Sequence, residues 1–365
     1  MKKQVKVLQI FASLNMGGAE SRMMDVYRKI DKEKIDFDFL TMQEDKQYFE
    51  DEILTLGGKI IKIKPPRERG SFGNFSDIKR VLKEGNYDAV HAHTSFHCGL
   101  VCLAAFFARI KIRIAHARTT GSKNPSFKNK IALILGRSLI ALFSTKRLAI
   151  SKMSGEYLFG KSEFEVMPNA IDLDKYENVT VEETEHIKTE FNLHNTTIIG
   201  MVGRFDSMKN HTFALDFFAE YLKSHPNTKL VFVGDGQLRE EIVAKINALK
   251  LTDNVILTGI RKDVNIWMHV FDILIVPSLF EGLGGIILEA QAAGTPVVKS
   301  NTFTNEADMN IGLVNAVPLE IEKFIDAVNS GLKLNSPDFS VIETAFNNRH
   351  YSLAYEINRL EDIYS

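Results

Sequence analysis

The chain has 365 residues, which is more than one hydrophobic core usually supports, so we expect two domains. Its net charge of −1, hydrophobic content of 45% and charged content of 25% are those of an ordinary globular protein. The two cysteines lie four residues apart in one apolar segment, and no apolar stretch is long and uninterrupted enough to cross a bilayer, which argues against a disulfide framework and a transmembrane helix.

The first half of the sequence alternates predicted strands and helices. Its opening segment, 6–14, is interpreted as a strand and not as a signal peptide, because Lys6 and Gln9 interrupt the apolar residues. Gly17 and Gly18 follow and open a predicted helix, as in an anion-binding loop. Further strands are predicted at 36–42, 59–64, 87–93, 112–117 and 147–151. This alternation predicts a parallel, doubly wound sheet. Because the sequence suggests neither a signal peptide nor a transmembrane helix, we expect a cytoplasmic protein.

Three histidines end two of these strands. His91 and His93 close the segment 87–93, and His116 closes the segment 112–117. Open α/β sheets bind ligands at the carboxyl ends of their strands. These histidines therefore either serve a ligand site or are structural residues with satisfied hydrogen bonds.

The segment 89–155 contains eleven Lys and Arg residues and no Asp or Glu. Within it, 127–143 mixes apolar residues with Lys128, Lys130 and Arg137, as in a basic amphipathic helix. Such a helix either rests on an anionic membrane or packs on the core with a solvated basic rim. No nucleic-acid partner is expected, because base-stacking aromatic residues and known binding modules are missing from the sequence.

A second α/β unit begins near residue 197. Arg204 and Lys209 lie five residues apart in the loop after its first strand, where they either clamp two phosphates or are ordinary surface cations. A buried strand at 273–276 is followed by Glu281, a glycine-rich loop and a helix that carries Glu289. Free N–H groups at such a helix start favour an anion, and the two carboxylates either accept hydrogen bonds from sugar hydroxyls or, in an ordinary strand-to-helix turn, face water.

Six motifs together resemble the family 4 retaining glycosyltransferases, which have the GT-B fold. They are GGAE at 17–20, HAHT at 91–94, MPNAID at 167–172, GRFDSMKN at 203–210, VGDG at 233–236 and the E-x7-E pair at 281 and 289. The sequence looks most similar to the transferases of bacterial exopolysaccharide and capsule synthesis. The resemblance implies an α/β fold of two Rossmann-like domains that face each other across a crevice.

The resemblance also implies domain boundaries. The acceptor-binding domain would span 1–169, a junction 170–197, and the donor-binding domain 198–349. The segment 172–190 is acidic and polar without a sustained apolar face, which is typical of a linker. A final helix within 350–365 would pack back on the first domain through Leu353, Ile357, Leu360 and Tyr364.

Roles follow for residues at the motif positions. Glu281, His116 and Arg118 are the candidate catalytic residues. Arg118 stands where many members of the family carry a histidine close to the transferred sugar, so that either His116 or Arg118 takes over its role, or neither does. The donor diphosphate would be bound by Gly17, Gly18, Arg204, Lys209, Gly284 and Gly285, the ribose and sugar by Glu281, Gly282, Leu283 and Glu289, and the base by Gly234, Gly259, Ile260 and Arg261. His93 and Asn169 would lie on the acceptor side.

The implied reaction transfers a hexosyl unit from a nucleoside-diphosphate sugar, with UDP favoured, to a saccharide acceptor with retention of configuration. Cations and helix-start N–H groups would stabilise the leaving diphosphate, so neither a metal nor another cofactor is expected. The acid-free basic stretch favours a lipid-linked acceptor and a peripheral position on the membrane. Two alternatives remain: a nucleotide-sugar epimerase of the same architecture, and a two-lobed sugar-binding protein without catalysis.

Overall fold

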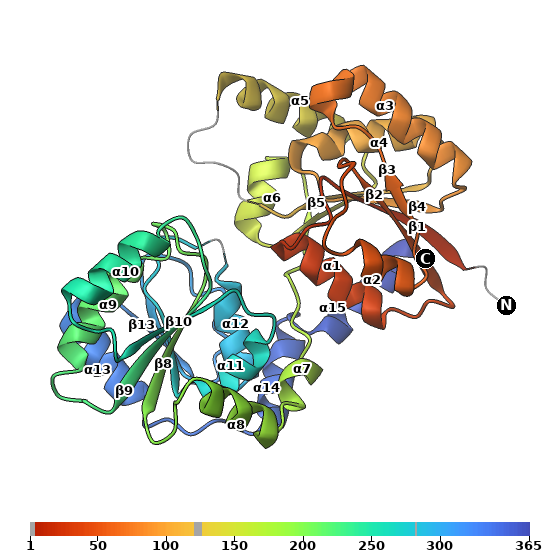
Figure 1. The fold of residues 1–365 in the computed structure, drawn as a ribbon. Helices are drawn as coiled ribbons and strands as arrows, with labels where there is room; N and C mark the ends of the chain where they lie inside the picture. The colour runs from red at the N-terminus through yellow and green to blue at the C-terminus, as the bar shows by residue number, and fades with distance from the viewer. Residues whose placement is uncertain (1–3, 120–125, 282) are drawn as a thin grey trace. The chain divides into compact units, whose positions relative to one another are not determined.

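The computed structural model describes residues 4–119, 126–281 and 283–365 (Figure 1). The chain divides into two compact units. Unit 1 comprises Met1–Ala170 and Leu353–Ser365, and unit 2 comprises Ile171–Ser352. The chain therefore leaves unit 1, builds all of unit 2, and returns to unit 1 for its last helix.

Unit 1 is built on a seven-stranded parallel sheet of order β3-β2-β1-β4-β5-β6-β7. The strands are β1 (Val5–Phe11), β2 (Ile35–Thr41), β3 (Ile60–Lys62), β4 (Ala89–Ala92), β5 (Ile112–Ala117), β6 (Lys146–Ala149) and β7 (Glu165–Val166). The direction of winding reverses between β1 and β4, which is the position at which α/β sheets bind ligands.

Helices cover both faces of this sheet. They are α1 (Gly18–Lys29), α2 (Glu50–Thr55), α3 (Pro66–Glu84), α4 (Cys98–Phe107), α5 (Phe127–Phe143), α6 (Lys152–Phe159) and α15 (Leu353–Tyr364), with a 3-10 turn η1 (Ser95–His97). Successive residues of a strand point to opposite faces. Leu8 and Ile10 accordingly belong to one core, whereas Val7 and Phe11 belong to the other, which is completed by α1 and α15.

Unit 2 repeats the same topology with a six-stranded parallel sheet of order β10-β9-β8-β11-β12-β13. Its strands are β8 (Thr197–Val202), β9 (Thr228–Val233), β10 (Val255–Gly259), β11 (Ile273–Val276), β12 (Val297–Ser300) and β13 (Val314–Val317). Its helices are α7 (Asp174–Glu177), α8 (Val181–Glu190), α9 (His211–Tyr221), α10 (Arg239–Ala248), α11 (Val264–Val270), α12 (Gly285–Ala292), α13 (Ile321–Gly331) and α14 (Phe339–Asn348).

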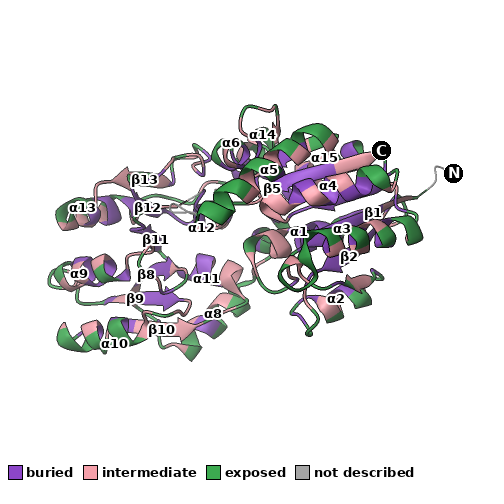
Figure 2. Ribbon diagram, turned by 90° about the horizontal axis from the view of Figure 1, so that it is seen from above, coloured by how far each residue is buried: buried purple, intermediate pink, exposed green. Residues whose placement is uncertain are grey.

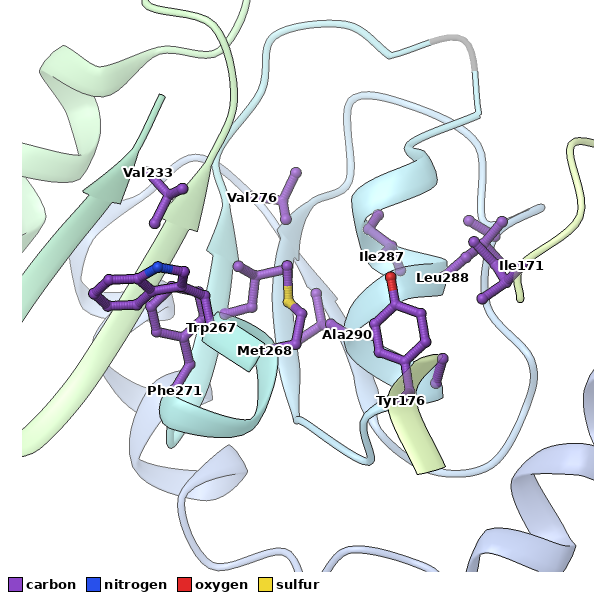
Figure 3. Packing of buried hydrophobic residues seen from close by; sticks show 14 of the residues in the cluster. Ile171, Tyr176, Val233, Trp267, Met268, Phe271, Val276, Ile287, Leu288 and Ala290 are labelled. Carbon is purple, nitrogen blue, oxygen red and sulfur yellow. The ribbon is translucent and has the colours of Figure 1, made fainter. Parts of the chain in front are cut away.

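Of the segment 170–197, which the sequence indicated as a linker, all but Ala170 belongs to unit 2. Thr180 and Glu183 form a capping box at the start of α8, and Ile187 and Leu193 are buried. Tyr176 packs in the same core, beside α12 in Figure 3. Few apolar residues suffice here, because Ile187 lies on the buried side of the capped helix α8 and Leu193 is buried in the segment that follows it.

Candidate active site

In unit 2, the loop after β8 holds its own shape through Asp206. One carboxylate oxygen of Asp206 accepts hydrogen bonds from the backbone N–H groups of Met208 and Lys209, at 3.0 and 3.1 Å. Asn210 then adopts a left-handed conformation, with φ of 61°, and α9 begins. This turn fixes the backbone from which the Lys209 side chain extends.

The loops after β8 and β11 are joined to each other. The Lys209 Nζ atom lies 2.5 Å from Glu281 Oε1, and Ser278 Oγ donates to the same oxygen at 2.9 Å. Leu279 N also donates to the Met208 carbonyl, and Asn210 Nδ2 donates to the Pro277 carbonyl. The sequence predicted separate roles for Lys209 and Glu281 at the diphosphate and at the sugar, and the structure places the two side chains in contact.

A second layer of hydrogen bonds holds the β11 loop from behind. Ser300 Oγ and Thr302 Oγ1 both donate to the Ser278 carbonyl, at 2.5 and 2.9 Å. Lys299 is 1% exposed, donates to the Ser300 and Phe303 carbonyls, and lies 4.0 Å from the centre of the Phe303 ring. Burial lowers the pKa of Lys299. Sequence reasoning missed this support, although a single lysine in the apolar segment 297–300 was a signal.

The glycines of unit 2 allow three loops to pack closely. A Cβ atom on Gly234 would lie 2.0 Å from the Gly203 carbonyl oxygen, and one on Gly236 would lie 2.5 Å from the Phe205 carbonyl oxygen. Gly234 N donates to the Gly259 carbonyl, so the loop after β10 joins the loops after β8 and β9. Side chains at Gly234 or Gly236 would separate these loops.

The residues predicted to bind the base follow β9 and β10. Arg261 donates to Asp263 at 2.9 and 2.6 Å and stands above the Trp267 ring, so its side chain is already engaged. Ile260 is 73% exposed. Only their backbone groups were predicted to meet the base, and that remains a prediction.

The anion site was predicted at the start of helix α12, and it remains a prediction. Gly284 adopts a left-handed conformation, with φ of 79°, and precedes the first helical residue, Gly285. Leu283 is buried in the core, and Glu289 is half-buried one turn into the helix. Gly282 lies outside the described residues.

Arg204 is exposed and forms no ion pair with any residue that the structure describes. Its guanidinium group is therefore available to an anion.

In unit 1, the histidines converge on the carboxyl ends of β4 and β5. His91 Nε2 lies 3.0 Å from His116 Nδ1, and His91 Nδ1 lies 2.6 Å from the hydroxyl oxygen of Tyr364 in α15. His93 Nε2 lies 3.0 Å from Gln9 Oε1, and Gln9 in turn donates to Tyr364. Sequence reasoning named Tyr364 only as a packing residue of the last helix and gave Gln9 no role in the site, although Gln9 was visible as a polar residue among the apolar residues of the first strand.

Arg118 connects the histidine cluster to Asn169, near the end of the first segment of unit 1. Its Nε donates to His93 Nδ1 at 3.2 Å, and its Nη1 donates to Asn169 Oδ1 at 2.8 Å. The residues predicted as catalytic, His116 and Arg118, and those predicted on the acceptor side, His93 and Asn169, thus form one cluster. Burial lowers the pKa of all three histidines well below the usual value, and the positive charge of Arg118 acts in the same direction.

Among the described residues, these three histidines are close enough together to be considered as candidate metal ligands. Their candidate ligand atoms lie within 4.8 Å of one another. All three residues are buried, and five of their six ring nitrogens are engaged by Tyr364, Gln9, Arg118 and each other, whereas His116 Nε2 has no partner among the described residues.

Gly17 and Gly18 stand at the start of α1, as predicted, with Gly17 as the residue before the helix. A Cβ atom on Gly17 would lie 2.5 Å from a carboxylate oxygen of Glu20. Burial raises the pKa of Glu20, and the charge of Arg118 opposes that rise.

Comparison with known proteins identifies the family. The model of glycosyl transferases group 1 matches residues 182–345, and that of Glycosyltransferase Family 4 matches residues 16–175. "Putative glycosyltransferase EpsF" of Bacillus subtilis (strain 168) is 31% identical over 371 residues, which cover 99% of this chain and 97% of that protein. The chain is a family 4 glycosyltransferase.

Two further proteins extend the likeness. The capsular polysaccharide biosynthesis glycosyltransferase CapH of Staphylococcus aureus is 31% identical over 310 residues, 82% of each chain. The solved structure of Anabaena Alr3699/HepE with UDP and glucose superposes with a TM-score of 0.78 over 98% of this chain and 99% of that one, at 18% identity. The predicted family, of the kind found in capsule and exopolysaccharide synthesis, and the prediction of two Rossmann-like domains of the GT-B type are confirmed.

None of the helices among the described residues of this glycosyltransferase combines the length and the apolar character that crossing a bilayer requires.

His211, the first residue of α9, gives the glycosyltransferase an acid-sensitive position. The side chain packs edge-on against Phe205 and Phe232, is 2% exposed, and finds no hydrogen-bond partner for either ring nitrogen among the described residues. Burial lowers its pKa from 6.5 to about 4. The unfolded chain takes up a proton below pH 6.5 while the folded protein does not, so stability is lost as the pH falls from 6.5 to about 4.

We expect His211→Phe to remove this loss. The difference in unfolding free energy between the variant and the parent should be about 1.4 kcal/mol larger at pH 5.5 than at pH 7.5. This is the free energy of protonating the unfolded histidine alone one pH unit below its pKa of 6.5. Chemical denaturation at both pH values measures it. His186→Phe in α8 is the control, because solvent reaches His186 in the folded protein. Equal pH dependence of the His211→Phe variant and the parent would contradict this assignment.

Proposed function

We propose that this glycosyltransferase moves a hexosyl unit from a UDP-sugar to a lipid-linked saccharide during exopolysaccharide or capsule synthesis, with retention of configuration and without a metal. The contact between Lys209 and Glu281 carries the proposal. It joins the loop expected to hold the diphosphate to the loop expected to hold the sugar. The solved structure of Alr3699/HepE with UDP and glucose supports the choice of a UDP donor.

The chemistry needs positive charge where the diphosphate leaves. Lys209 and Arg204 supply two cations from the loop after β8, and the first N–H groups of α12 have no acceptor within the helix. Lys209 and the helix-start N–H groups are fixed before the substrate arrives, and together with Arg204 they can take the place of a divalent cation. Glu281 is held by two donors, which suits a carboxylate that orients a sugar through its hydroxyls.

The lipid-linked acceptor is supported by the outer face of α5. Gly136 and Ile140 pack this helix on α4, where a Cβ atom on Gly99 would lie 2.6 Å from the Gly136 carbonyl oxygen. The opposite face is apolar and exposed (Figure 2), with Phe127 at 77%, Ile131 at 44%, Ile134 at 61%, Leu135 at 60% and Leu142 at 74%. An exposed apolar face of this kind marks a binding surface, and insertion into a lipid leaflet would bury these side chains.

Lys128 and Lys130 flank the exposed apolar face at its first turn and suit anionic lipid headgroups. Arg137, which the sequence placed on the same basic rim, has a different role. It donates to the Tyr157 carbonyl at 3.1 Å and so binds the end of α6. Lys123 lies outside the described residues.

Calorimetric titration of UDP, GDP and ADP in the presence of EDTA tests the donor. We expect UDP to bind and the other two to bind at least about 10-fold more weakly, the equivalent of 1.4 kcal/mol. Incubation of the enzyme with UDP-sugars, with and without a lipid-linked acceptor, then tests the reaction. A changed sugar nucleotide formed from donor alone would identify an epimerase, and absence of all nucleotide binding would overturn the donor site.

A further inference from the structure

Six polar side chains of unit 1 form one continuous hydrogen-bonded chain. It runs from Arg118 to His93, Gln9, Tyr364, His91 and His116. Five of the six are at most 8% exposed, and four elements, β1, β4, β5 and α15, contribute to it. Since water does not reach most of these groups, their hydrogen-bonding atoms depend on partners within the protein.

The first member sets the direction of the chain. A guanidinium group has only N–H donors, so His93 Nδ1 accepts the proton of Arg118 Nε. A neutral imidazole has one lone pair and one N–H, and burial keeps the pKa of His93 low enough for the neutral form. His93 Nε2 therefore carries the proton and donates it to Gln9 Oε1.

The direction is preserved through the next three members. Gln9 Nε2 donates to the Tyr364 hydroxyl oxygen at 3.0 Å. The hydroxyl proton of Tyr364 then has His91 Nδ1, at 2.6 Å, as its acceptor, since Tyr364 is 1% exposed and a proton without an acceptor would be costly. His91 Nε2 carries the ring proton and donates it to His116 Nδ1.

The chain ends on a donor. His116 accepts at Nδ1, so its proton is on Nε2, and this nitrogen has no hydrogen-bond partner among the described residues. It lies at the carboxyl end of β5, next to the point where the winding of the sheet reverses. A buried donor without an acceptor costs about 1–3 kcal/mol in a folded protein. A ligand oxygen would satisfy it.

We propose that Arg118 fixes His91, His93 and His116 in the same Nε2–H tautomer, and that His116 thereby presents an N–H donor to an oxygen of the bound substrate. Gln9 and Tyr364 are positioning residues that act through His91. The substrate part of the proposal rests on the transferase function proposed above. In this arrangement His116 is not a general base, and the single lone pair of each ring already accepts a hydrogen bond, so the cluster does not bind a divalent metal.

Long-range ¹H–¹⁵N spectra of histidine side chains in the intact protein test the tautomers without any assay of activity. We expect all three residues as Nε2–H imidazoles at pH 7, unchanged by added Zn²⁺. A protonated Nδ1, an imidazolium ion, or a zinc-dependent change in these signals would overturn the proposal.

Two variants test the direction of the chain. Tyr364→Phe interrupts the chain in the middle, so His91 and His116 should show mixed tautomers while His93 keeps its Nε2 proton. Arg118→Met removes the first donor, so His93 should also become mixed. A merely structural role for Tyr364 would lower the melting temperature without this residue-specific pattern, and that outcome would overturn the positioning role.

Substrate contact is tested by two further readouts. The His116 Nε2 signal should move when the UDP-sugar or the acceptor is added, and it should not move if a buried water is its partner. His116→Gln, which keeps a side-chain N–H, should retain about 10-fold more kcat/KM than His116→Leu, a difference of one hydrogen bond. If the three histidines are Nε2–H tautomers but substrate has no effect on His116, only the proposed substrate contact is refuted. If the protein is not a transferase, the tautomer assignment can still hold, because the spectra test it without substrate.

Discussion

Replacing Lys209 by alanine is expected to weaken UDP binding about 10²- to 10³-fold, because the change removes a charged hydrogen-bond donor and also leaves a carboxylate unpaired. Lys209 stands 2.5 Å from Glu281, and the two side chains are only 22% and 15% exposed. Without the lysine, the negative charge of Glu281 faces the incoming diphosphate. Arg204→Ala should cost less, about 10- to 10²-fold, because Arg204 neutralises no carboxylate of the protein.

A double variant of Lys209 and Glu281 tests whether their contact, and not only the lysine charge, affects UDP binding. In the Lys209→Ala background, Glu281→Gln should recover about 10-fold of the lost UDP affinity, since it removes the unpaired charge and keeps the shape of the side chain. Calorimetry on the two single variants and the double variant measures the coupling. Lys323→Ala is the control for net charge, because this lysine is exposed on α13 of unit 2 and its loss changes the charge by the same amount. Additive losses for Lys209 and Glu281 would show that the contact has no part in nucleotide binding.

Serine at Phe127, Ile134 and Leu142 is expected to lower the affinity for anionic vesicles about 10³-fold, given about 1.5 kcal/mol for each large side chain that enters the lipid. These three side chains are the most exposed apolar residues of α5. Lys128→Gln/Lys130→Gln should lower the affinity less, about 30-fold at about 1 kcal/mol per charge, and only at low salt. The apolar contribution should therefore dominate at physiological ionic strength.

Co-sedimentation with vesicles of mixed zwitterionic and anionic lipid measures both effects. Serine at Val181, Leu334 and Val341 is the matched control, since these are exposed apolar residues of unit 2. UDP affinity should stay unchanged in all of these variants. If the α5 variant and the control remained on vesicles to the same extent, the membrane-facing role of α5 would be refuted.

The regular parts of the fold could be predicted because the signals for each strand and helix lie within a short segment of the sequence. Apolar runs such as 273–276, ended by Pro277, identify buried strands, and glycine-rich loops after them identify helix starts. Helix α8 could not be recognised in this way. Only Ile187 faces the core from its ten residues, and the capping box at Thr180 was a stronger signal than the hydrophobic pattern.

The candidate site could be predicted as a set of residues but not as a set of contacts. Lys209 and Glu281 are 72 residues apart and meet only because β8 and β11 are neighbours in the sheet. The sequence named His91, His93 and His116, yet it offered no means of pairing them with Gln9 and Tyr364. Those two residues come from the first strand and the last helix, and the fold alone brings them together.

The return of the chain to unit 1 has a consequence for biosynthesis. The ribosome completes the whole of 171–352 before it makes α15, so unit 2 has all of its residues before unit 1 does. Until then, the face of the unit 1 sheet that carries Gln9 and His91 lacks Leu353, Leu360 and Tyr364. A nascent chain of this protein therefore has an unfinished amino-terminal core until α15 is made.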